Sequence, residues 1–234
     1  MWEFARVGEG GGWVLPVGFA EKMERLLGAE FEAFLASYDR PLAPGLRENP
    51  RKRAPAALLA DFHLTDVPWA RDGHYYDPLT RPGLSPLHDA GAYYLQEPSA
   101  MAPAGLLGAQ PGERVLDLCA APGGKSTQLA AAMAGRGLLV CNEINPKRAK
   151  ILAGNIERMG IANALVLSEH PARLAERFAG FFDRILVDAP CSGEGMFRKE
   201  AAAVTDWSEE AHAHGNDVQL RALRKKVPAH AGAA

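Results

Sequence analysis

Near its start the chain places apolar residues at helical spacing. In residues 17–38 they recur every three or four positions, a pattern that predicts an amphipathic helix, and Gly28 predicts a break into two short helices. Residues 39–104 have little periodicity and are rich in Pro, Gly and Tyr. We expect this segment to be ordered but rich in loops, because Trp69 and its tyrosines supply apolar area that a disordered linker lacks.

From residue 111 onward, apolar runs alternate with helical stretches. Continuous apolar runs occupy residues 114–120, 137–144, 163–168 and 182–190, and helix-forming stretches occupy residues 126–134 and 145–160. Asn145 with Pro146, and then Gly160, are start and stop signals for the second of these helices. Strands that read as continuous apolar runs between helices predict a parallel sheet covered on both faces, and therefore an α/β fold.

Composition restricts the classes of function. Three cysteines, no run of about 18 apolar residues and no basic-then-apolar leader predict a cytoplasmic protein with reduced thiols and no membrane span. The formal charge of −2 gives no overall attraction to nucleic acid. A polyanion partner would need a local basic patch, and the candidate is Arg47, Arg51, Lys52 and Arg53 against Glu48, with a solvated loop as the alternative.

A glycine turn follows the first predicted strand. Ligands of parallel sheets bind beyond the carboxyl ends of the strands, where glycines let the backbone approach. Gly123 and Gly124 occupy this position, and Glu143 ends the second strand, where a carboxylate can accept both hydroxyls of a ribose. The spaced GxGxxG of a dinucleotide site is absent. The pattern favours a cofactor with one nucleoside and no pyrophosphate, of which S-adenosylmethionine is the commonest.

Three motifs carry a resemblance to a known family. The stretches "LDLCAAPGGKSTQLA", "NEINPKRAKILAGNIERMG" and "FDRILVDAPCSGEGMFRK" resemble the cofactor motifs and the Pro-Cys loop of the Sun-domain RNA (cytosine-5)-methyltransferases. Earlier stretches, among them "YYDPLTRPGLSPLHDAGAYYLQEPSAM", resemble the amino-terminal region of the bacterial ribosomal RNA branch of that family. The resemblance runs from about residue 15 to about residue 208.

The resemblance implies a class I (Rossmann-like) S-adenosylmethionine-dependent methyltransferase fold with a smaller α+β RNA-binding domain before it. Residues 1–104 would position RNA, residues 105–200 would form a truncated methyltransferase domain, and residues 201–234 would be a divergent tail. The four strands would lie in the order 3-2-1-4. This order leaves residues 184–187 at an open edge, which is a hazard for association.

The resemblance also implies which residues bind the cofactor. They are Cys119, Ala120, Ala121, Pro122, Gly123, Gly124, Lys125, Glu143, His170 and Asp188. Lys125 would meet the carboxylate end of S-adenosylmethionine, with a solvated lysine as the alternative. His170 stands where the family often carries an acid beside the adenine amine, and histidine accepts that hydrogen bond only in its neutral form.

Methylation of cytosine at carbon 5 needs a thiolate. Carbon 5 is a poor nucleophile until a thiolate adds at carbon 6. The resemblance implies that Cys191 resolves this adduct and that Asp188 acts beside it, while the attacking cysteine belongs to a Thr-Cys motif that these 234 residues lack. Cys119 lies inside the cofactor turn, and Cys141, in the second strand, is expected to be a small buried residue.

We therefore predict a ribosomal RNA cytosine-C5 methyltransferase whose chain is incomplete and catalytically impaired. The sequence departs abruptly from the family after Trp207, which a frameshift or premature stop would explain. A non-catalytic remnant that binds RNA and cofactor is the main alternative, and a DNA cytosine methyltransferase that attacks with Cys191 is another. His88, His212 and His214 have no metal-ligand spacing and are expected at the surface, without a metal.

Overall fold

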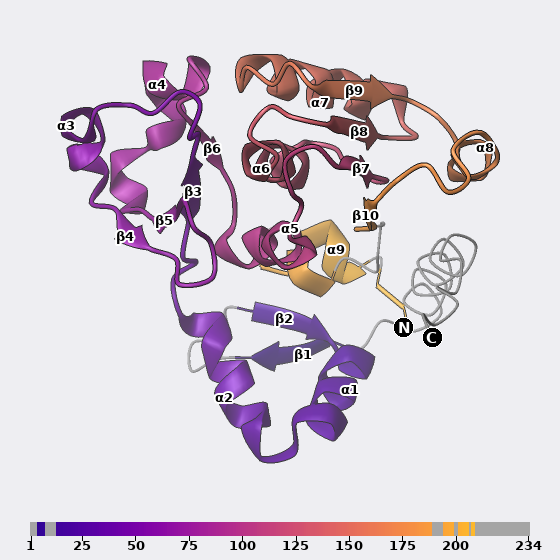
Figure 1. Ribbon diagram of the computed structural model, residues 1–234. Helices are drawn as coiled ribbons and strands as arrows, with labels where there is room; N and C mark the ends of the chain where they lie inside the picture. Colours follow the sequence, from indigo (N-terminus) through magenta and orange to yellow (C-terminus); the bar gives the residue numbers. More distant parts are fainter. Residues whose placement is uncertain (1–3, 8–12, 189–193, 199–200, 206, 209–234) are drawn as a thin grey trace, which may run out of the picture. The chain divides into compact units, whose positions relative to one another are not determined.

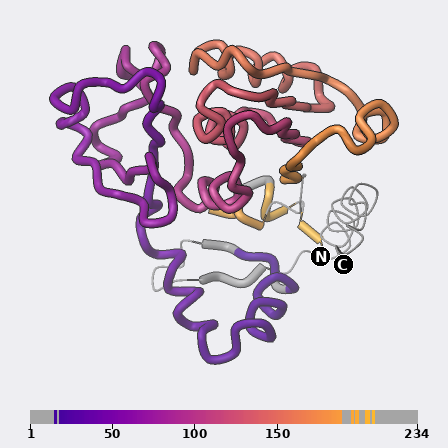
Figure 2. Tube along the Cα trace, in the orientation of Figure 1, coloured from indigo at the N-terminus to yellow at the C-terminus, as the bar shows by residue number. Residues whose placement is uncertain are grey.

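The computed structural model describes residues 4–7, 13–188, 194–198, 201–205 and 207–208 (Figure 1). Figure 2 follows the same backbone from end to end. The chain forms two compact units. Of the described residues, the first unit combines those up to Leu42 with those between 194 and 208, and the second unit is Ala43–Asp188. The domain boundary expected at residue 104 stays a prediction.

The first unit contains a strand pair and several short helices. Strands β1 (Phe4–Val7) and β2 (Trp13–Pro16) are antiparallel. The helical segments are α1 (Val17–Leu27), η1 (Gly28–Glu30), α2 (Phe31–Ala36), η2 (Ser37–Asp39), η7 (Glu194–Met196) and α9 (Ala201–Thr205), where η marks a 3-10 helix. Gly28 follows α1 with φ +50°, so the predicted break between two helices is confirmed.

An aromatic core connects the amino-terminal helices of the first unit with Phe197, Val204 and Trp207. The ring centroid of Phe19 lies 4.9 Å from that of Phe197 and 5.9 Å from that of Trp207. The buried members of this core are Leu15, Phe19, Tyr38, Phe197, Val204 and Trp207. Val204 and Trp207, which the sequence assigned to a divergent tail, are therefore part of a packed core.

The second unit begins with an antiparallel sheet in the order β4-β5-β3-β6. Its strands are β3 (Gly45–Glu48), β4 (Thr65–Asp66), β5 (Gly73–Tyr75) and β6 (Tyr93–Leu95). The helical segments around it are α3 (Ala56–Leu59), η3 (Ala60–Phe62), η4 (Pro78–Thr80), η5 (Pro82–Leu84), α4 (Pro86–Asp89), η6 (Pro98–Met101) and α5 (Ala102–Leu107). Leu46, Phe62 and Tyr93 are buried in its core, which confirms an ordered, loop-rich segment, although Trp69 is 49% exposed.

A parallel sheet in the order β10-β7-β8-β9 follows. Its strands are β7 (Arg114–Asp117), β8 (Leu138–Asn142), β9 (Ala164–Leu167) and β10 (Arg184–Leu186), with helices α6 (Gly124–Ala132), α7 (Pro146–Arg158) and α8 (Pro171–Arg177) between them. The predicted strand order 3-2-1-4 is confirmed. Among the described strands, β10 pairs with β7 alone and therefore stands at an edge, as expected.

Both faces of the parallel sheet are covered by helices. Successive side chains of a strand point to opposite faces. Val115 of β7 belongs to one apolar cluster with Leu129 of α6 and Leu152 of α7, whereas its neighbour Leu116 belongs to another with Leu174 of α8. The continuous apolar runs of the sequence reflect this burial on both sides.

Helix α7 begins and ends at the predicted signals. Asn145 Oδ1 accepts hydrogen bonds from two backbone N–H groups of the first turn, and Pro146 takes the first helical position. After the helix, Gly160 adopts φ +71°, a conformation that favours glycine. This start places Glu143 between the carboxyl end of β8 and the amino terminus of α7.

Candidate functional site

The glycine turn connects β7 to α6 and is closely packed on two sides. Gly123 has φ +119°, and a Cβ there would lie 3.2 Å from Leu152 Cδ1. Gly124 is the first residue of α6, and a Cβ there would lie 3.3 Å from Tyr94 and 3.4 Å from Gln96. Both positions therefore favour glycine because of packing and, at Gly123, also because of backbone conformation.

Side chains of α7 hold the carbonyl groups of the turn. Arg148 Nη2 donates to Ala121 O over 2.9 Å, and Asn155 Nδ2 donates to Pro122 O over 2.8 Å. The peptide bond between Ala121 and Pro122 is cis. The predicted cofactor residues 119–124 thus lie in one hydrogen-bonded turn at the carboxyl end of β7.

Glu143 lies just beyond the carboxyl end of β8 and is 3% exposed. Its Oε1 accepts the Asn145 N–H over 2.9 Å, and its Oε2 pairs with Arg148 Nη1 over 3.2 Å. Arg148 also donates to the turn, so it connects this carboxylate to the glycine turn. Because a carboxylate has about four lone-pair positions, Glu143 retains acceptor capacity for the hydroxyls of a ribose.

Lys125 and Asp188, two predicted site residues, form an ion pair. Lys125 Nζ lies 2.6 Å from Asp188 Oδ2. Lys125 is in the first turn of α6, and Asp188 follows β10, so the pair spans the ends of neighbouring elements. Lys125 is therefore paired rather than solvated, and its contact with a cofactor stays a prediction.

Asp117 is a candidate site residue that the sequence reasoning missed. It ends β7, is 1% exposed, and its Oδ2 accepts the Ser126 hydroxyl over 2.7 Å. Its Oδ1 is buried and has no hydrogen-bond partner in the part of the chain that the structure describes. Burial raises the pKa of this carboxyl from 3.8 to about 6, although the bond from Ser126 opposes the rise. The signal that could have found it is an acid inside the apolar run 114–120.

Burial keeps two of the three thiols protonated. It raises the pKa of Cys119 to about 11 and the pKa of Cys141 to about 12, and the charge of Asp117 adds to both shifts. Because the thiolate is the nucleophilic form, neither thiol is activated at neutral pH. Cys141 is 0% exposed, which confirms the prediction of a small buried residue. Cys191, the predicted catalytic thiol, lies outside the described residues.

His170 caps the amino terminus of α8. Its Nδ1 accepts the Ala172 N–H over 3.2 Å. This bond requires a lone pair on Nδ1 and places the proton of the neutral ring on Nε2. In this tautomer Nε2 donates and does not accept a hydrogen bond from an adenine amine. The contact of His170 with a cofactor stays a prediction. In this tautomer, Nε2 can donate a hydrogen bond to a ring nitrogen of the base.

The basic group at residues 47–53, expected from the sequence to be a patch for a polyanion or a solvated loop, lies only partly at the surface. Arg47 is 2% exposed. Lys52 Nζ donates to two backbone carbonyl groups over 2.7 and 3.1 Å, and Arg53 pairs with Asp72 over 3.1 Å. Arg47 is therefore not available to phosphates, and its interpretation as part of a phosphate-binding patch is wrong. Arg51, Lys52 and Arg53 are exposed, and their role in a basic patch stays a prediction.

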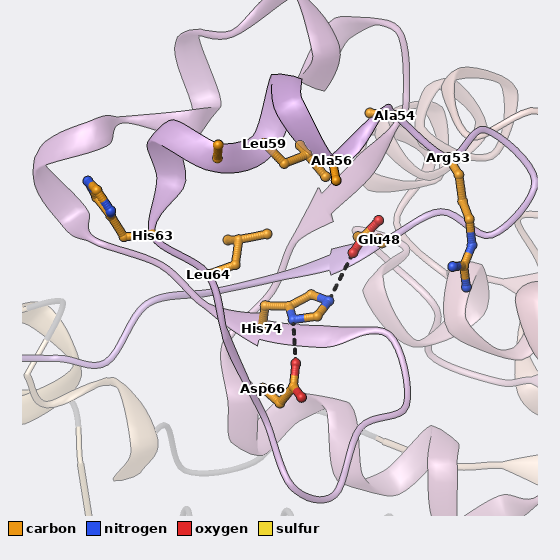
Figure 3. A pocket seen from close by; sticks show the side chains of 10 residues that line it. Glu48, Arg53, Ala54, Ala56, Leu59, His63, Leu64, Asp66 and His74 are labelled. Atoms are coloured by element: carbon orange, nitrogen blue, oxygen red, sulfur yellow. Dashed lines mark ion pairs between the residues drawn. The ribbon is translucent and has the colours of Figure 1, made fainter.

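A separate hollow of about 540 Å³ lies on the antiparallel sheet (Figure 3). Leu59 and Leu64 contribute to its lining, and Figure 3 shows His74 between two carboxylates. His74 Nε2 lies 3.0 Å from Glu48 Oε1, and His74 Nδ1 lies 3.1 Å from Asp66 Oδ1. The predicted cofactor residues do not line this hollow, so it is distinct from the glycine turn.

Within the described ranges, no helix is long and apolar enough to cross a membrane. The same residues contain no group of three or more His, Cys, Asp or Glu side chains that could hold a metal ion. The His88 side chain is 25% exposed, and its ring centroid lies 6.0 Å from that of Tyr93. His212 and His214 lie outside the description.

Two family models match the sequence. The model described as 16S rRNA methyltransferase RsmB/F matches residues 104–228, and the model described as the N-terminal domain of 16S rRNA methyltransferase RsmF matches residues 15–98. The first match continues past residue 208, where the resemblance was expected to end. Together they agree with the family resemblance predicted from the motifs.

The chain is also similar to named proteins. It is 37% identical over 209 residues to the ribosomal RNA small subunit methyltransferase F of Erwinia tasmaniensis, and 38% identical over the same length to that of Vibrio cholerae. Each comparison covers 84% of this chain and 44% of the relative. The chain therefore spans less than half the length of these curated relatives.

Solved structures share its fold. A methyltransferase homolog protein from Pyrococcus horikoshii has a TM-score of 0.75 at 28% identity, over 88% of this chain and 67% of the other. The structure of NSun6 from Pyrococcus horikoshii with SFG has the same TM-score at 16% identity, over 91% of this chain and 80% of the other, which shows the fold alone. These likenesses confirm the predicted Rossmann-like methyltransferase fold.

Proposed function

We propose that this chain, which belongs to the 16S rRNA methyltransferase RsmB/F family, carries the S-adenosylmethionine site of an enzyme that methylates cytosine carbon 5 in ribosomal RNA. The observation that carries the proposal is the glycine turn with Glu143 beside it. A turn at the carboxyl ends of adjacent parallel strands is suited to a nucleoside. The cofactor would supply the methyl group on its sulfonium.

The side chains around the turn fit such a cofactor. Glu143 offers carboxylate oxygens for a ribose, and Asp117 offers a buried Oδ1 that has no partner among the described residues. The family resemblance gives Lys125 the carboxylate end of the cofactor. Because Gly123 and Gly124 have no side chain, the turn packs closely against Leu152, Tyr94 and Gln96, which fixes its backbone.

For the base, we propose the covalent route of the family. A thiolate adds at carbon 6 of cytosine, carbon 5 then attacks the methyl group, and loss of the carbon 5 proton releases the thiolate. Cys191 and Asp188 are the proposed catalytic residues, with Cys191 resolving the adduct. The 234 residues contain no Thr-Cys pair to supply the attacking thiol. We therefore expect them to transfer little or no methyl by themselves.

A second candidate is a chain that binds RNA and cofactor without methyl transfer. The observation that favours it is the burial of Cys119 and Cys141, because burial raises the pKa of both thiols and keeps them protonated. Cys191 is the third cysteine of the sequence. For either candidate we propose ribosomal RNA as partner and the cytoplasm as location, where thiols stay reduced.

Radiolabelled S-adenosylmethionine and unmodified 16S ribosomal RNA distinguish the two candidates. We expect incorporation close to background for the 234 residues, and incorporation restored when the Thr-Cys segment of a longer relative is joined in frame. Cys141→Ala, which removes a buried thiol, is the matched control for Cys191→Ala. Strong incorporation by the 234 residues that Cys191→Ala abolishes and Cys141→Ala preserves would make Cys191 the attacking thiol, contrary to the proposal.

A further inference from the structure

A buried arginine connects the antiparallel sheet with the start of α6. Arg47 of β3 donates from Nη2 to Thr127 Oγ1 over 2.6 Å and to Gly124 O over 3.2 Å. Its Nε donates to Gln96 Oε1 over 3.2 Å. Gly124 and Thr127 form the first turn of α6, directly after the glycine turn. One guanidinium therefore binds both the neighbouring sheet and the backbone that ends the turn.

Arg47 remains charged although it is 2% exposed. Burial lowers the pKa of its guanidinium to about 10, and the charge of Asp72 opposes this shift. The three acceptors are neutral: a carbonyl, a hydroxyl and an amide oxygen. Hydrogen bonds from a charged donor are stronger than bonds between neutral groups, and the planar fork of arginine fixes their directions in a way that lysine does not.

Neighbours of Arg47 in the sequence bind the other helix of the site. Asn49 Nδ2 donates to Met159 O over 2.9 Å, and Lys52 Nζ donates to Arg158 O over 2.7 Å. These carbonyls belong to the carboxyl end of α7, where a cation or donor is favourable because of the helix dipole. Since α7 also supplies the side chains that hold the turn, residues 47–52 bind both helices that flank it.

We propose that Arg47 is a positioning residue for the S-adenosylmethionine site. It fixes the first turn of α6, and with it the glycine turn, in the conformation that receives the cofactor. This inference rests on the proposed function, because it takes the turn to be the cofactor site. It gives Arg47 a role in cofactor binding through protein contacts, in place of a role in binding phosphates.

Calorimetric titration with S-adenosylmethionine tests the role of Arg47. Arg47→Met removes the guanidinium and keeps much of the volume, and Thr127→Val removes the hydroxyl acceptor with little change of shape. We expect the dissociation constant to rise about tenfold in each, as for the loss of a buried charged hydrogen bond. Arg47→Lys should restore part of the affinity, and Arg71→Met, at an exposed arginine of the same unit, should leave it unchanged.

A double-mutant cycle separates positioning from a general loss of stability. If Arg47 acts through Thr127, the variant with both substitutions should bind about as weakly as Arg47→Met alone, whereas independent effects would add. Urea unfolding and circular dichroism on the same samples establish that each variant is folded. If Arg47→Met does not fold, Thr127→Val and Arg47→Lys carry the comparison.

The outcomes distinguish this inference from the function on which it rests. Wild-type affinity in folded Arg47→Met, Arg47→Lys and Thr127→Val, or additive losses in the cycle, would overturn the positioning role and leave the cofactor site standing. If the wild-type chain does not bind S-adenosylmethionine at all, the proposed function fails and the inference fails with it.

Discussion

The buried carboxyl of Asp117 should make the chain less stable as pH rises. Its pKa is raised from 3.8 to about 6 by burial, so the folded chain holds this proton more tightly than the unfolded chain does. The stabilising contribution of the protonated form is complete below pH 3.8 and is lost as pH rises through about 6. At neutral pH a buried, charged carboxylate remains, with one oxygen unpartnered among the described residues.

The size of the effect follows from the two pKa values. The difference between 3.8 and about 6 corresponds to a cost of about 3 kcal/mol in unfolding free energy at pH 7, and to roughly half of that at pH 5. Asp117→Asn removes the ionisation, and its amide oxygen can still accept the Ser126 hydroxyl. We expect this variant to be more stable than wild type at pH 7, by up to about 3 kcal/mol, with a smaller advantage at pH 5.

Urea unfolding of both proteins at pH 5 and pH 7, followed by circular dichroism, measures this difference. Asp183→Asn is the control of opposite sign, because hydrogen bonds from Arg114 lower the pKa of Asp183. That stabilisation is present above pH 3.8, and it is lost as pH falls below 3.8 through the lower pKa of the folded chain. Asp183→Asn should therefore be less stable than wild type at pH 7. An advantage of Asp117→Asn that is equal at both pH values would refute the assignment of a raised pKa.

Two further predictions concern packing and buried hydrogen bonds. Phe197→Ala should lower the unfolding free energy of the first unit by about 3–5 kcal/mol, because the Phe197 ring packs against Phe19. Urea unfolding followed by tryptophan fluorescence measures this loss, and an effect as small as that of Leu26→Ala, at an exposed leucine, would contradict it. Asn49→Ala should cost about 1–3 kcal/mol and accelerate hydrogen exchange near the carboxyl end of α7, where unchanged exchange would refute the capping contact.

The sequence predicted the parallel sheet well because its signals are local. Four apolar runs marked the four strands, and Asn145, Pro146 and Gly160 marked the ends of one helix. Strand order followed from the family resemblance. The ends of strands were less accurate: residues 118–120 were assigned to the first strand, whereas β7 ends at Asp117 and a turn begins at Leu118.

The candidate site was predicted only in part, because burial depends on contacts between distant residues. The glycines and Glu143 were found from their places after strands. Arg47 was interpreted from its charged neighbours in the sequence, while its partners are about 80 residues further on, at Gly124 and Thr127. No pattern of neighbouring residues predicts such a contact. A basic side chain is expected at the surface unless distant residues bring hydrogen-bond acceptors to it.

Calorimetric titration of the chain with S-adenosylmethionine measures whether the glycine turn and Glu143 form the cofactor site. We expect saturable binding that Glu143→Ala weakens by roughly 1–3 kcal/mol, or about 5- to 150-fold. Glu157→Ala, at an exposed glutamate of α7, should have no effect. Absence of binding by the wild-type chain, or equal affinity in Glu143→Ala, would contradict the assignment of this site.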